Sequence, residues 1–459
     1  MRVIVVGAGD VGYDVARLLS QKRHDVTVVD TDPKRLAHTR ETLDVLTVEG
    51  SGTNTDTLQE ARVEEADLLV AVTDVDEVNI IASMIAERVG KSSDETVTIA
   101  RVRSGDFIGD HAVLSLDDFG IDHIIHPEQS TANEVVSLLR RAAATDVVDF
   151  CQERLQLVGI RIDRGAPVVG KTLAELSQKG SHLAFRVMGI ARGVRTLVPR
   201  GDATIQGNDQ VFVLVPTGQV AQVAHLLGKE AGRLRYAMIL GGTNVGARVA
   251  AGLAQRTGRG RDAFEMQVKL VEANRSRAET LAESLEDVLV LHGDPSDIDF
   301  LAREGLSEMD AVVAVTGDEE SNLVSCLMAK HLGVRKTIAL LSKSSYIPVA
   351  QTIGLDAAVS QKLAVSRDVL RFLRGSHVRS AATVQGLDAE ILELLAEPGS
   401  PITQGPLAEQ DLPRGVLIGA VVGEQVEIAT GPTVVAPGSQ VIVFSTADRL
   451  GDVEALFSA

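Results

Sequence analysis

The stretch that decides the fold of this chain is Arg2-Val3-Ile4-Val5-Val6-Gly7-Ala8-Gly9-Asp10-Val11-Gly12. Its first five residues form an apolar run, which is typical of a strand buried on both faces of a sheet. Apolar side chains then recur at helical spacing over residues 11–19, and a second apolar run, residues 26–29, ends at Asp30. The order strand, glycine-rich turn, helix, strand and acid is the pattern of a dinucleotide-binding βαβ unit.

Each residue of this pattern has a physical task. Gly7 permits the tight turn, Gly9 lets a phosphate approach the backbone, and Gly12 lets the helix pack closely on the strand. The N-terminus of the helix offers free N–H groups and a positive dipole end to an anion. Asp30 is placed to accept hydrogen bonds from both ribose hydroxyls of an adenosine. The alternative is a glycine-rich turn without a ligand, and the strands and the acid around the motif favour nucleotide binding.

Further apolar runs continue the same architecture. The runs at residues 45–48, 67–72, 96–101 and 121–125 alternate with helical segments, which predicts a doubly wound parallel sheet. Ligands of such sheets lie outside the carboxyl ends of the strands. The candidate cofactor-binding residues of this half are those of the turn and the strand ends: Gly7, Ala8, Gly9, Asp10, Val11, Gly12, Asp30, Gly52, Thr53, Thr73, Asp74, Asn79 and Arg101.

Two charged positions refine the choice of nucleotide. A 2′-phosphate would face Asp30 and Asp32, so the sequence disfavours NADP. Arg101 follows a buried strand, where its guanidinium could simply be solvated. We prefer a contact with bound phosphate, because a guanidinium suits that anion well.

The composition limits the class of protein. Of 459 residues, 45% are hydrophobic and only 3% aromatic, which suits the aliphatic core of parallel sheets. No apolar run is long enough to cross a bilayer, and the N-terminus lacks the layout of a signal peptide. We therefore expect a cytoplasmic protein with no direct membrane insertion. The net charge of −18 argues against nucleic acid and anionic lipid as partners.

Candidate metal ligands carry little weight in this sequence. Cys151 and Cys326 are isolated, and buried thiols are the better interpretation. His123 and His126 are three apart on a predicted strand, where they point to opposite faces and do not share a metal. We expect no metal site.

A small α+β module follows a helix predicted over residues 127–143. Short strands at 154–162, 185–191, 196–198 and 211–215 and short helices at 173–176 and 220–227 indicate it. Within it, Gly165 to Thr172 fits the P-loop pattern. Pro167 removes an N–H and the next helix is short, so we interpret the stretch as a turn capping that helix. A P-loop NTPase is a distant alternative.

The second half of the chain repeats the first. Residues 237–246 repeat the opening strand and turn, residues 268–272 repeat the second strand, and residues 399–409 repeat part of the small module. The corresponding candidate cofactor-binding residues are Gly241, Thr243, Asn244, Val245, Gly246, Glu272, Asp294 and Thr316.

The second copy departs from the first at informative places. Thr243 replaces the middle glycine, and Leu340 stands in the place of Arg101. The loop before the second strand is longer and carries the arginines Arg256, Arg259 and Arg261. We expect the second half to keep an adenosine site with a weaker or different hold on phosphate, unless one of these arginines reaches into it.

The expected fold is therefore α/β, with two tandem Rossmann-like parallel-sheet domains, each followed by a small α+β module. The expected boundaries are residues 1–142 and 230–373 for the Rossmann-like domains and residues 143–229 and 374–459 for the modules.

With these motifs the chain resembles the TrkA family, the cytoplasmic nucleotide-binding subunits of bacterial and archaeal Trk potassium uptake systems. The resemblance rests on Gly7 to Gly12, Asp30, residues 66–74 and 99–101 and the duplicated module, and it covers essentially the whole chain. It implies tandem regulator-of-K⁺-conductance (RCK) domains, each with a Rossmann-like and an α+β lobe. It also implies binding of NAD(H) and ATP or ADP, no catalytic activity, and a homo-oligomeric, tetrameric ring. The implied partner is a membrane potassium channel subunit of the TrkH or TrkG type, which would hold the protein peripherally at the inner face of the membrane.

An NAD-dependent dehydrogenase built on a duplicated Rossmann fold is the alternative. Such an enzyme needs a substrate domain that supplies acid–base residues. The two duplicated units use up the chain, and His182, His225 and His377 have no recognisable partner. We favour a regulator in which a nucleotide biases the lobes between two arrangements, with the apolar helix at residues 134–143 as a candidate for packing between lobes.

Overall fold

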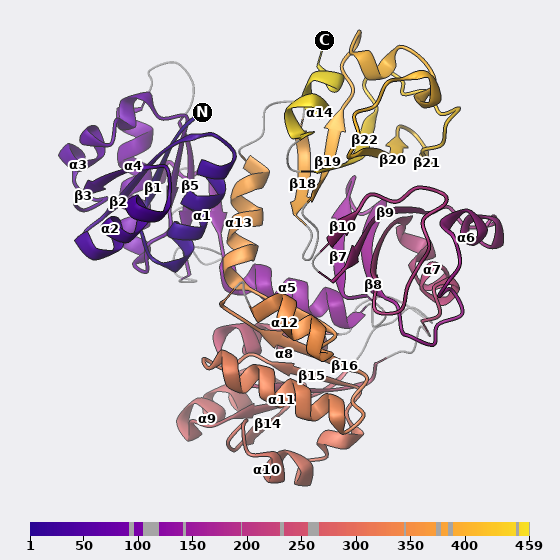
Figure 1. Ribbon diagram of the computed structural model, residues 1–459. Coiled ribbons are helices and arrows are strands. Elements are labelled where there is room, and N and C mark those ends of the chain that lie inside the picture. Colours follow the sequence, from indigo (N-terminus) through magenta and orange to yellow (C-terminus); the bar gives the residue numbers. More distant parts are fainter. Residues whose placement is uncertain are drawn as a thin grey trace. The chain divides into compact units, whose positions relative to one another are not determined.

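The structure is a computed structural model (Figure 1). It describes residues 1–90, 96–103, 119–140, 144–193, 195–229, 234–255, 266–343, 346–372, 378–383, 389–446 and 449–458. The chain forms two compact units, Met1–Thr131 with Ser360–Leu373, and Ala132–Val359 with Arg374–Ala459. Each unit thus contains a helix that the sequence assigns to the other half, and the boundaries expected from the repeat stay a prediction.

The first unit is a Rossmann-like lobe on a six-stranded parallel sheet with the order β3-β2-β1-β4-β5-β6. The direction of winding reverses between β1 and β4, which is where doubly wound sheets bind ligands. Its elements are β1 (Arg2–Val6), α1 (Asp10–Gln21), β2 (Asp25–Asp30), α2 (Pro33–Thr42), β3 (Leu46–Glu49), α3 (Thr55–Glu60), η1 (Val63–Glu65), β4 (Leu68–Ala71), α4 (Asp76–Val89), β5 (Val97–Arg101), β6 (His123–Ile125) and the start of α5 (Pro127–Arg140).

Helix α13 (Gln361–Phe372) comes from the second half of the sequence but packs in the first unit beside α1 (Figure 1). Its Val365 and Val369 share one hydrophobic core with Val15 of α1. The Asp368 carboxylate accepts a hydrogen bond of 2.9 Å from the Ser130 hydroxyl. The first lobe is therefore covered on one side by a helix from the other half of the chain.

The second unit contains the second Rossmann-like lobe, whose parallel sheet has the corresponding order β14-β13-β12-β15-β16-β17. Its elements are β12 (Tyr236–Leu240), α8 (Asn244–Ala254), β13 (Gln267–Glu272), α9 (Arg275–Ser284), β14 (Val288–His292), α10 (Ile298–Arg303), η5 (Leu306–Glu308), β15 (Ala311–Ala314), α11 (Glu319–His331), β16 (Lys336–Leu340), α12 (Tyr346–Ile353) and β17 (Ala357–Val359).

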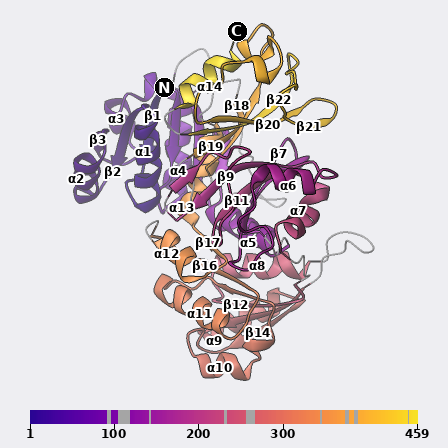
Figure 2. The same cartoon turned by 45° about the vertical axis from the view of Figure 1, so that its right-hand side comes forward.

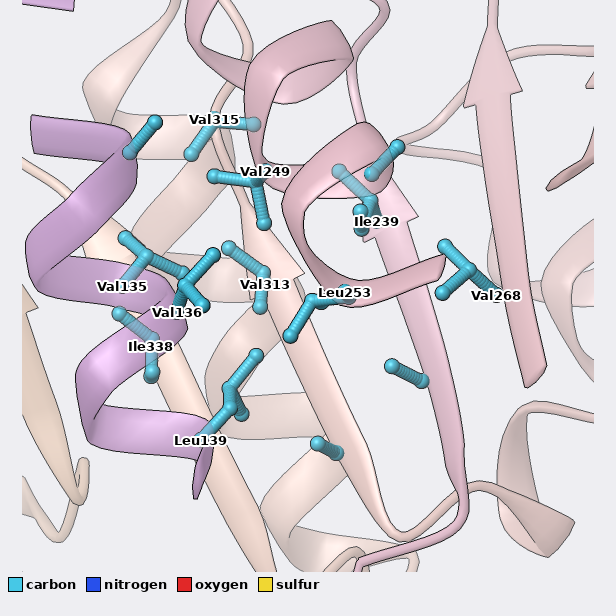
Figure 3. Packing of buried hydrophobic residues seen from close by; sticks show 14 of the residues in the cluster. Val135, Val136, Leu139, Ile239, Val249, Leu253, Val268, Val313, Val315 and Ile338 are labelled. Atoms are coloured by element: carbon cyan, nitrogen blue, oxygen red, sulfur yellow. The ribbon is translucent and has the colours of Figure 1, made fainter. Parts of the chain in front are cut away.

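The apolar face of α5 packs on this second lobe and not on the lobe that precedes it in the sequence. Figure 3 shows Val135, Val136 and Leu139 of α5 pointing towards Val249 and Leu253 of α8. The approach is close, because a methyl group on Gly252 would lie 3.1 Å from Val136. The apolar helix expected at residues 134–143 is thus a packing element of the other lobe, and its residues 141–143 lie outside the described part of the chain.

The two small modules have the same topology and belong to the second unit. The strand orders are β10-β9-β11-β8-β7 in the first and β18-β19-β22-β20-β21 in the second. The first contains β7 (Asp146–Phe150), β8 (Leu155–Arg161), α6 (Leu173–Lys179), β9 (Arg186–Arg192), β10 (Arg195–Leu197), β11 (Gln210–Pro216), η3 (Thr217–Gln219) and α7 (Val220–Leu226). The second contains β18 (Val378–Thr383), β19 (Ala389–Leu395), η6 (Pro401–Thr403), η7 (Leu407–Glu409), β20 (Val416–Val422), β21 (Val426–Ile428), β22 (Gln440–Thr446) and α14 (Leu450–Phe457).

The two module sheets face each other across a shared apolar core (Figure 2). Phe212 of the first module and Phe444 of the second are both fully buried in it. A methyl group on Gly419 would lie 2.5 Å from the end of the Met188 side chain, so the two sheets come close at this glycine and Met188 would have to shift to admit a side chain. The modules therefore form one body within the second unit.

Strand β7, which pairs antiparallel with β8, was not predicted from the sequence. The turn between them runs through Cys151, Gln152 and Glu153, whose φ angles are 51°, 56° and 64°. Such positive angles normally call for glycine or asparagine, and neither marks this turn. The residue types of this turn therefore gave no signal from which the hairpin could be predicted.

The structure also bears on the predictions about the cysteines and about membrane-spanning helices. Cys151 and Cys326 are both buried, unpaired thiols, as predicted. In the ranges that the structure describes, no helix is both long enough and apolar enough to span a bilayer.

Candidate functional site

The glycine turn after β1 divides into framework glycines and one open glycine. Gly7 has a φ of +106° and lies against the Thr73 backbone, and a methyl group on Gly12 would lie 1.8 Å from the Gly7 carbonyl oxygen. Gly9 is in extended conformation, and its nearest neighbour on that side is Arg35, 3.6 Å away. Gly7 and Gly12 are thus required by the fold, while a methyl group on Gly9 would clash with nothing and would only contact the Arg35 guanidinium.

The N-terminus of α1 lies at this turn. Gly9 is the N-cap residue, and no side chain caps the first turn, which begins with the exposed Asp10. Ala8 is buried and Val11 half-buried. The N–H groups at this end of the helix are therefore placed to meet an anionic ligand.

Asp30 ties the turn to the end of β2. One carboxylate oxygen accepts a hydrogen bond of 2.5 Å from the N–H of Ala8, and the other accepts one of 2.8 Å from the N–H of Asp32. Each carboxylate oxygen has a second lone pair, so the group can still accept hydroxyl hydrogen bonds from a ribose. The predicted adenosine-binding residue is thus already oriented by the turn that it would serve.

The turn after β3 supplies the next part of the edge. Gly52 is buried, and a methyl group there would lie 2.4 Å from Val6 of β1. Thr53 is exposed, and its hydroxyl lies 2.8 Å from that of Ser51. Gly52 therefore sets the packing of the turn, and Thr53 offers a hydroxyl at the surface.

Asn79 joins the ends of two strands. Its side-chain oxygen accepts from the N–H (2.9 Å) and hydroxyl (2.8 Å) of Thr73, and its nitrogen donates to the carbonyls of Thr73 (3.1 Å) and Arg101 (2.8 Å). Asn79 is fully buried, and these four bonds use its full hydrogen-bonding capacity. Its contribution to the site is to hold Thr73 and Arg101 in place.

Arg101 is buried between two acids. Its guanidinium lies 3.3 Å from the exposed Asp74 and 3.9 Å from the buried Glu128, and among the described residues its Nε has no hydrogen-bond partner. Burial raises the pKa of the Glu128 carboxyl, but the nearby His126 ring, the backbone and Arg101 outweigh it, so the pKa lies below its ordinary value. Glu128 is therefore a charged partner that already engages Arg101.

Arg35, in the first turn of α2, is a candidate site residue that was not predicted from the sequence. It lies beside Gly9 and 3.6 Å from the Asp32 carboxylate. The corresponding residue of the second lobe is Arg277, which donates hydrogen bonds to the Gly242 carbonyl (2.5 Å) and to Asn244 (3.1 Å). The signal was present in the repeat, because both arginines stand five residues after the acid that ends the second strand.

The second glycine turn repeats the framework of the first. Gly241 has a φ of +108° and lies against Thr316, and a methyl group on Gly246 would lie 2.0 Å from the Gly241 carbonyl oxygen. Asn322 holds Thr316 with the same bonds that Asn79 makes to Thr73. Val245 is buried beside Gly246 in the first turn of α8. The backbone frame of the two lobes is therefore the same.

The ligand side of the second turn differs. The Thr243 hydroxyl donates to the Val315 carbonyl (2.8 Å) and accepts from the N–H of Gly246 (3.2 Å), so it caps the helix that the first lobe leaves uncapped. Glu272 accepts from the N–H groups of Gly242 (2.8 Å) and Asn274 (2.7 Å), as Asp30 does from its own turn.

Charge also differs between the two edges. Asp294 stands where the first lobe has Ser51, and hydrogen bonds from the Ser296 hydroxyl and N–H hold the pKa of Asp294 below its ordinary value. Leu340 is half-buried against the core in the place of Arg101. The loop arginines Arg256, Arg259 and Arg261 lie outside the described residues. At these described positions the second edge gains an acid at Asp294 and loses a cation at Leu340, while Asn244 and Gly317 stand where the first lobe has Asp10 and Asp74.

The P-loop pattern forms a turn, as predicted. The N–H groups of Gly170 and Lys171 donate to the carbonyls of Ile205 and Val168, so they are used within the turn. Thr172 caps α6 in a capping box with Glu175. Among the residues that the structure describes, no group of three or more His, Cys, Asp or Glu side chains is placed to hold a metal ion.

These features define a class of protein with two Rossmann-like nucleotide-type sites and two paired α+β modules. The TrkA-N domain model matches residues 3–127 and 237–361, and the TrkA-C domain model matches residues 157–228. The chain therefore belongs to the TrkA family.

Individual relatives agree with this assignment. The chain is 35% identical over 461 residues to Trk system potassium uptake protein TrkA homolog 1 of Methanosarcina mazei, with all of both chains covered. It is 32% identical over 463 residues to the Trk system potassium uptake protein TrkA of Vibrio alginolyticus, covering all of this chain and 98% of the relative. These relatives are named as potassium uptake proteins and not as enzymes.

Solved structures show the same fold. The crystal structure of the GsuK RCK domain matches with a TM-score of 0.60 at 18% identity, over 99% of this chain and 94% of that chain. The GsuK channel bound to NAD matches with a TM-score of 0.60 at 18% identity, over 99% and 78%. The predicted fold of tandem Rossmann-like lobes with RCK C-terminal modules is confirmed.

Proposed function

We propose that this chain is the nucleotide-sensing regulatory subunit of a Trk-type potassium uptake system. The observation that carries the proposal is the first lobe, where Asp30 and an uncapped helix N-terminus meet at the switch point of the sheet. The membership of the TrkA family connects this site to potassium uptake, because the relatives are named for that process.

The ligands that we propose are NAD(H) and the adenine nucleotides ATP and ADP. All share an adenosine ribose for Asp30 and a diphosphate for the turn from Gly7 to Gly12. The edge residues Thr53, Thr73, Asp74 and Arg101 complete the first site. The second site, with Gly241, Thr243, Asn244, Val245, Gly246, Glu272, Asp294 and Thr316, binds the same class with a different hold on phosphate. A neighbour of the same fold is titled as bound to NAD, which supports the dinucleotide.

The assembly that we propose is a homo-oligomeric, tetrameric ring in the cytoplasm. It meets a channel subunit of the TrkH or TrkG type at the inner face of the membrane and does not enter the bilayer. Gating works by population shift: a nucleotide that binds two arrangements of the lobes unequally biases the ring between them. A coupling free energy of roughly 1–3 kcal/mol is typical of such a device.

A ligand screen on the purified full-length protein tests the proposal. Calorimetric titration with NAD⁺, NADH, ATP and ADP should give saturable binding, and solution scattering should change on saturation. Channel activity in vesicles that hold the channel subunit should respond to the same nucleotides. Absence of binding, or identical scattering together with unchanged channel activity, contradicts the proposal. Hydride transfer from NADH to an added substrate would instead favour the dehydrogenase.

A further inference from the structure

We propose that Lys362 binds nucleotide phosphate at the first site and links that site to the second half of the chain. Lys362 lies in α13, the helix from the second half of the sequence that packs in the first unit. The proposal rests on the proposed function of the first lobe and names a residue that the glycine motif does not contain. Lys362 Nζ lies 3.1 Å from the carboxylate of Asp10, the residue that follows Gly9 and begins α1.

The position of this contact brings two helix N-termini together. Asp10 is the first residue of α1 and Lys362 the second of α13. The two helices pack side by side in one hydrophobic core that includes Val15 and Val365. The contact between Lys362 and Asp10 therefore brings the positive dipole ends of both helices near each other.

Helix stability gives no reason for a lysine at this position. The first turn of a helix favours acidic side chains and disfavours cations. The corresponding residue of α5 is Glu128, which follows that rule. Lys362 breaks the rule beside the glycine turn, which indicates a role for its charge outside its own helix.

Lys362 is far more buried than its partner Asp10, and this allows a phosphate to replace the Asp10 carboxylate in the ion pair. The Lys362 side chain is 20% exposed, whereas that of Asp10 is 82% exposed. An ion pair with so exposed a partner contributes little to stability. The phosphate chain of ATP or ADP at the N-terminus of α1 carries more charge in total than Asp10 and would reach the same ammonium, so it can take the place of the carboxylate.

The other cations of the first site are differently engaged. Arg101 lies between Asp74 and Glu128, and Arg35 stands on α2 near Asp32. Lys362 is held at the start of α1 itself, where the phosphate closest to the helix N–H groups would lie.

The chain connectivity gives the contact a consequence beyond affinity. Helix α13 follows β17 and precedes β18, and both strands belong to the second unit. A nucleotide that draws Lys362 from Asp10 therefore acts on the N-terminal end of a helix that lies between the second lobe and the second module in the sequence. By linkage, any arrangement of α13 that favours the nucleotide is favoured by it in return.

The test uses the full chain with Glu272→Ala, so that the first site dominates the titrations. Lys362→Gln should weaken ATP binding about tenfold, weaken ADP less, and leave adenosine unchanged. Lys362→Arg should keep most of the ATP affinity. Lys22→Gln, at the other end of α1, is the matched control and should bind like the parent.

Asp10→Asn separates phosphate binding from a structural ion pair. Both Lys362→Gln and Asp10→Asn break the pair, but only the lysine would touch phosphate. Because the carboxylate that competes with phosphate for Lys362 is gone, ATP should bind Asp10→Asn more tightly than the parent. Hydrogen exchange at residues 360–365 should slow on addition of ATP in the parent and not in Lys362→Gln.

The outcomes distinguish this inference from the function on which it rests. Equal ATP affinity of the parent and Lys362→Gln overturns the role of Lys362 and leaves the nucleotide site intact. Equal weakening of ATP and adenosine, or equal weakening by Lys362→Gln and Asp10→Asn, shows a structural pair and overturns it as well. A parent that binds no nucleotide overturns both proposals.

Discussion

The two glycine turns reach the same backbone frame with different side chains. In the first, Ala8 stands beside Asp30; in the second, Gly242 stands beside Glu272. A methyl group on Gly242 would lie 2.6 Å from the Glu272 carboxylate. The turn residue of the second lobe is thus one carbon smaller than Ala8, and its acid is one carbon longer than Asp30. The turn residue and the acid therefore fit only as a pair.

The N-termini of α1 and α8 differ in their side chains, although the backbone of the two turns is the same. The first turn of α1 is uncapped, whereas Thr243 caps α8 and uses the N–H of Gly246. A phosphate at the second site would compete with that hydroxyl for a donor. The difference predicts that ATP and ADP prefer the first site and that NAD(H), with less concentrated charge, discriminates less.

The largest expected effect tests the shared frame. Gly12→Ala and Gly246→Ala should each lower the free energy of unfolding by about 3 kcal/mol or more, because the new methyl group meets a backbone oxygen that cannot move away cheaply. Denaturant unfolding of the full chain measures this.

Gly9→Ala is the matched control for that experiment. Its methyl group would make an ordinary van der Waals contact with Arg35 at 3.6 Å and no clash, so stability should change by less than about 0.5 kcal/mol while nucleotide affinity falls. Equal stability of Gly9→Ala and Gly12→Ala would contradict the division into framework and ligand glycines.

The second prediction concerns the two acids. Asp30→Ala should weaken NAD(H), ATP and ADP together by roughly 1.5–3 kcal/mol at the first site, because hydrogen bonds to a charged acceptor are lost. Glu272→Ala should leave the tighter of the two binding steps unchanged. Calorimetry of the full chain measures both, and an unchanged affinity of Asp30→Ala for every nucleotide would place the site elsewhere.

The third prediction tests whether Gly242 and Glu272 fit only as a pair. Gly242→Ala should destabilise the protein by about 1–3 kcal/mol, since the methyl group also meets Leu281 at 2.6 Å. Adding Glu272→Asp should recover most of that loss, because it recreates the Ala8 and Asp30 pair. A double variant that is only as stable as the sum of both single changes would show that the two positions are independent.

Much of this site could be predicted from the sequence, because its parts are local. The motif from Gly7 to Gly12, the acid at Asp30 and the strand ends lie in one regular βαβ pattern. The repeat carried the same interpretation to Glu272. The hydrogen-bond and ion-pair partners of the polar side chains could not be predicted, so the sequence did not reveal that Asn79 holds Thr73 and Arg101 or that two acids lie beside Arg101.

The sequence could not predict that α5 packs on the second lobe and α13 on the first, and the reason is physical. Both helices have apolar faces of the right period, and periodicity does not say which sheet such a face will cover. Each lobe therefore depends on a helix from the other half. Fragments of residues 1–229 and 230–459 would lack that cover, and the inequality of the sites must be measured in the full chain.

The smallest expected effect would convert the second site towards the first. In a full chain with Asp30→Ala, Thr243→Gly removes the hydroxyl that occupies the N–H of Gly246. Replacing an N-cap threonine with glycine costs only a few tenths of a kcal/mol, and the lost bond to Val315 roughly 0.5–1.5 kcal/mol. One more N–H for a charged phosphate should strengthen ATP binding by up to about tenfold. Thr243→Ser keeps the hydroxyl and should bind ATP like the parent. If both variants behave alike in the titration, the cap is not what separates the two sites, and the charge difference at Asp294 and Leu340 is left to explain it.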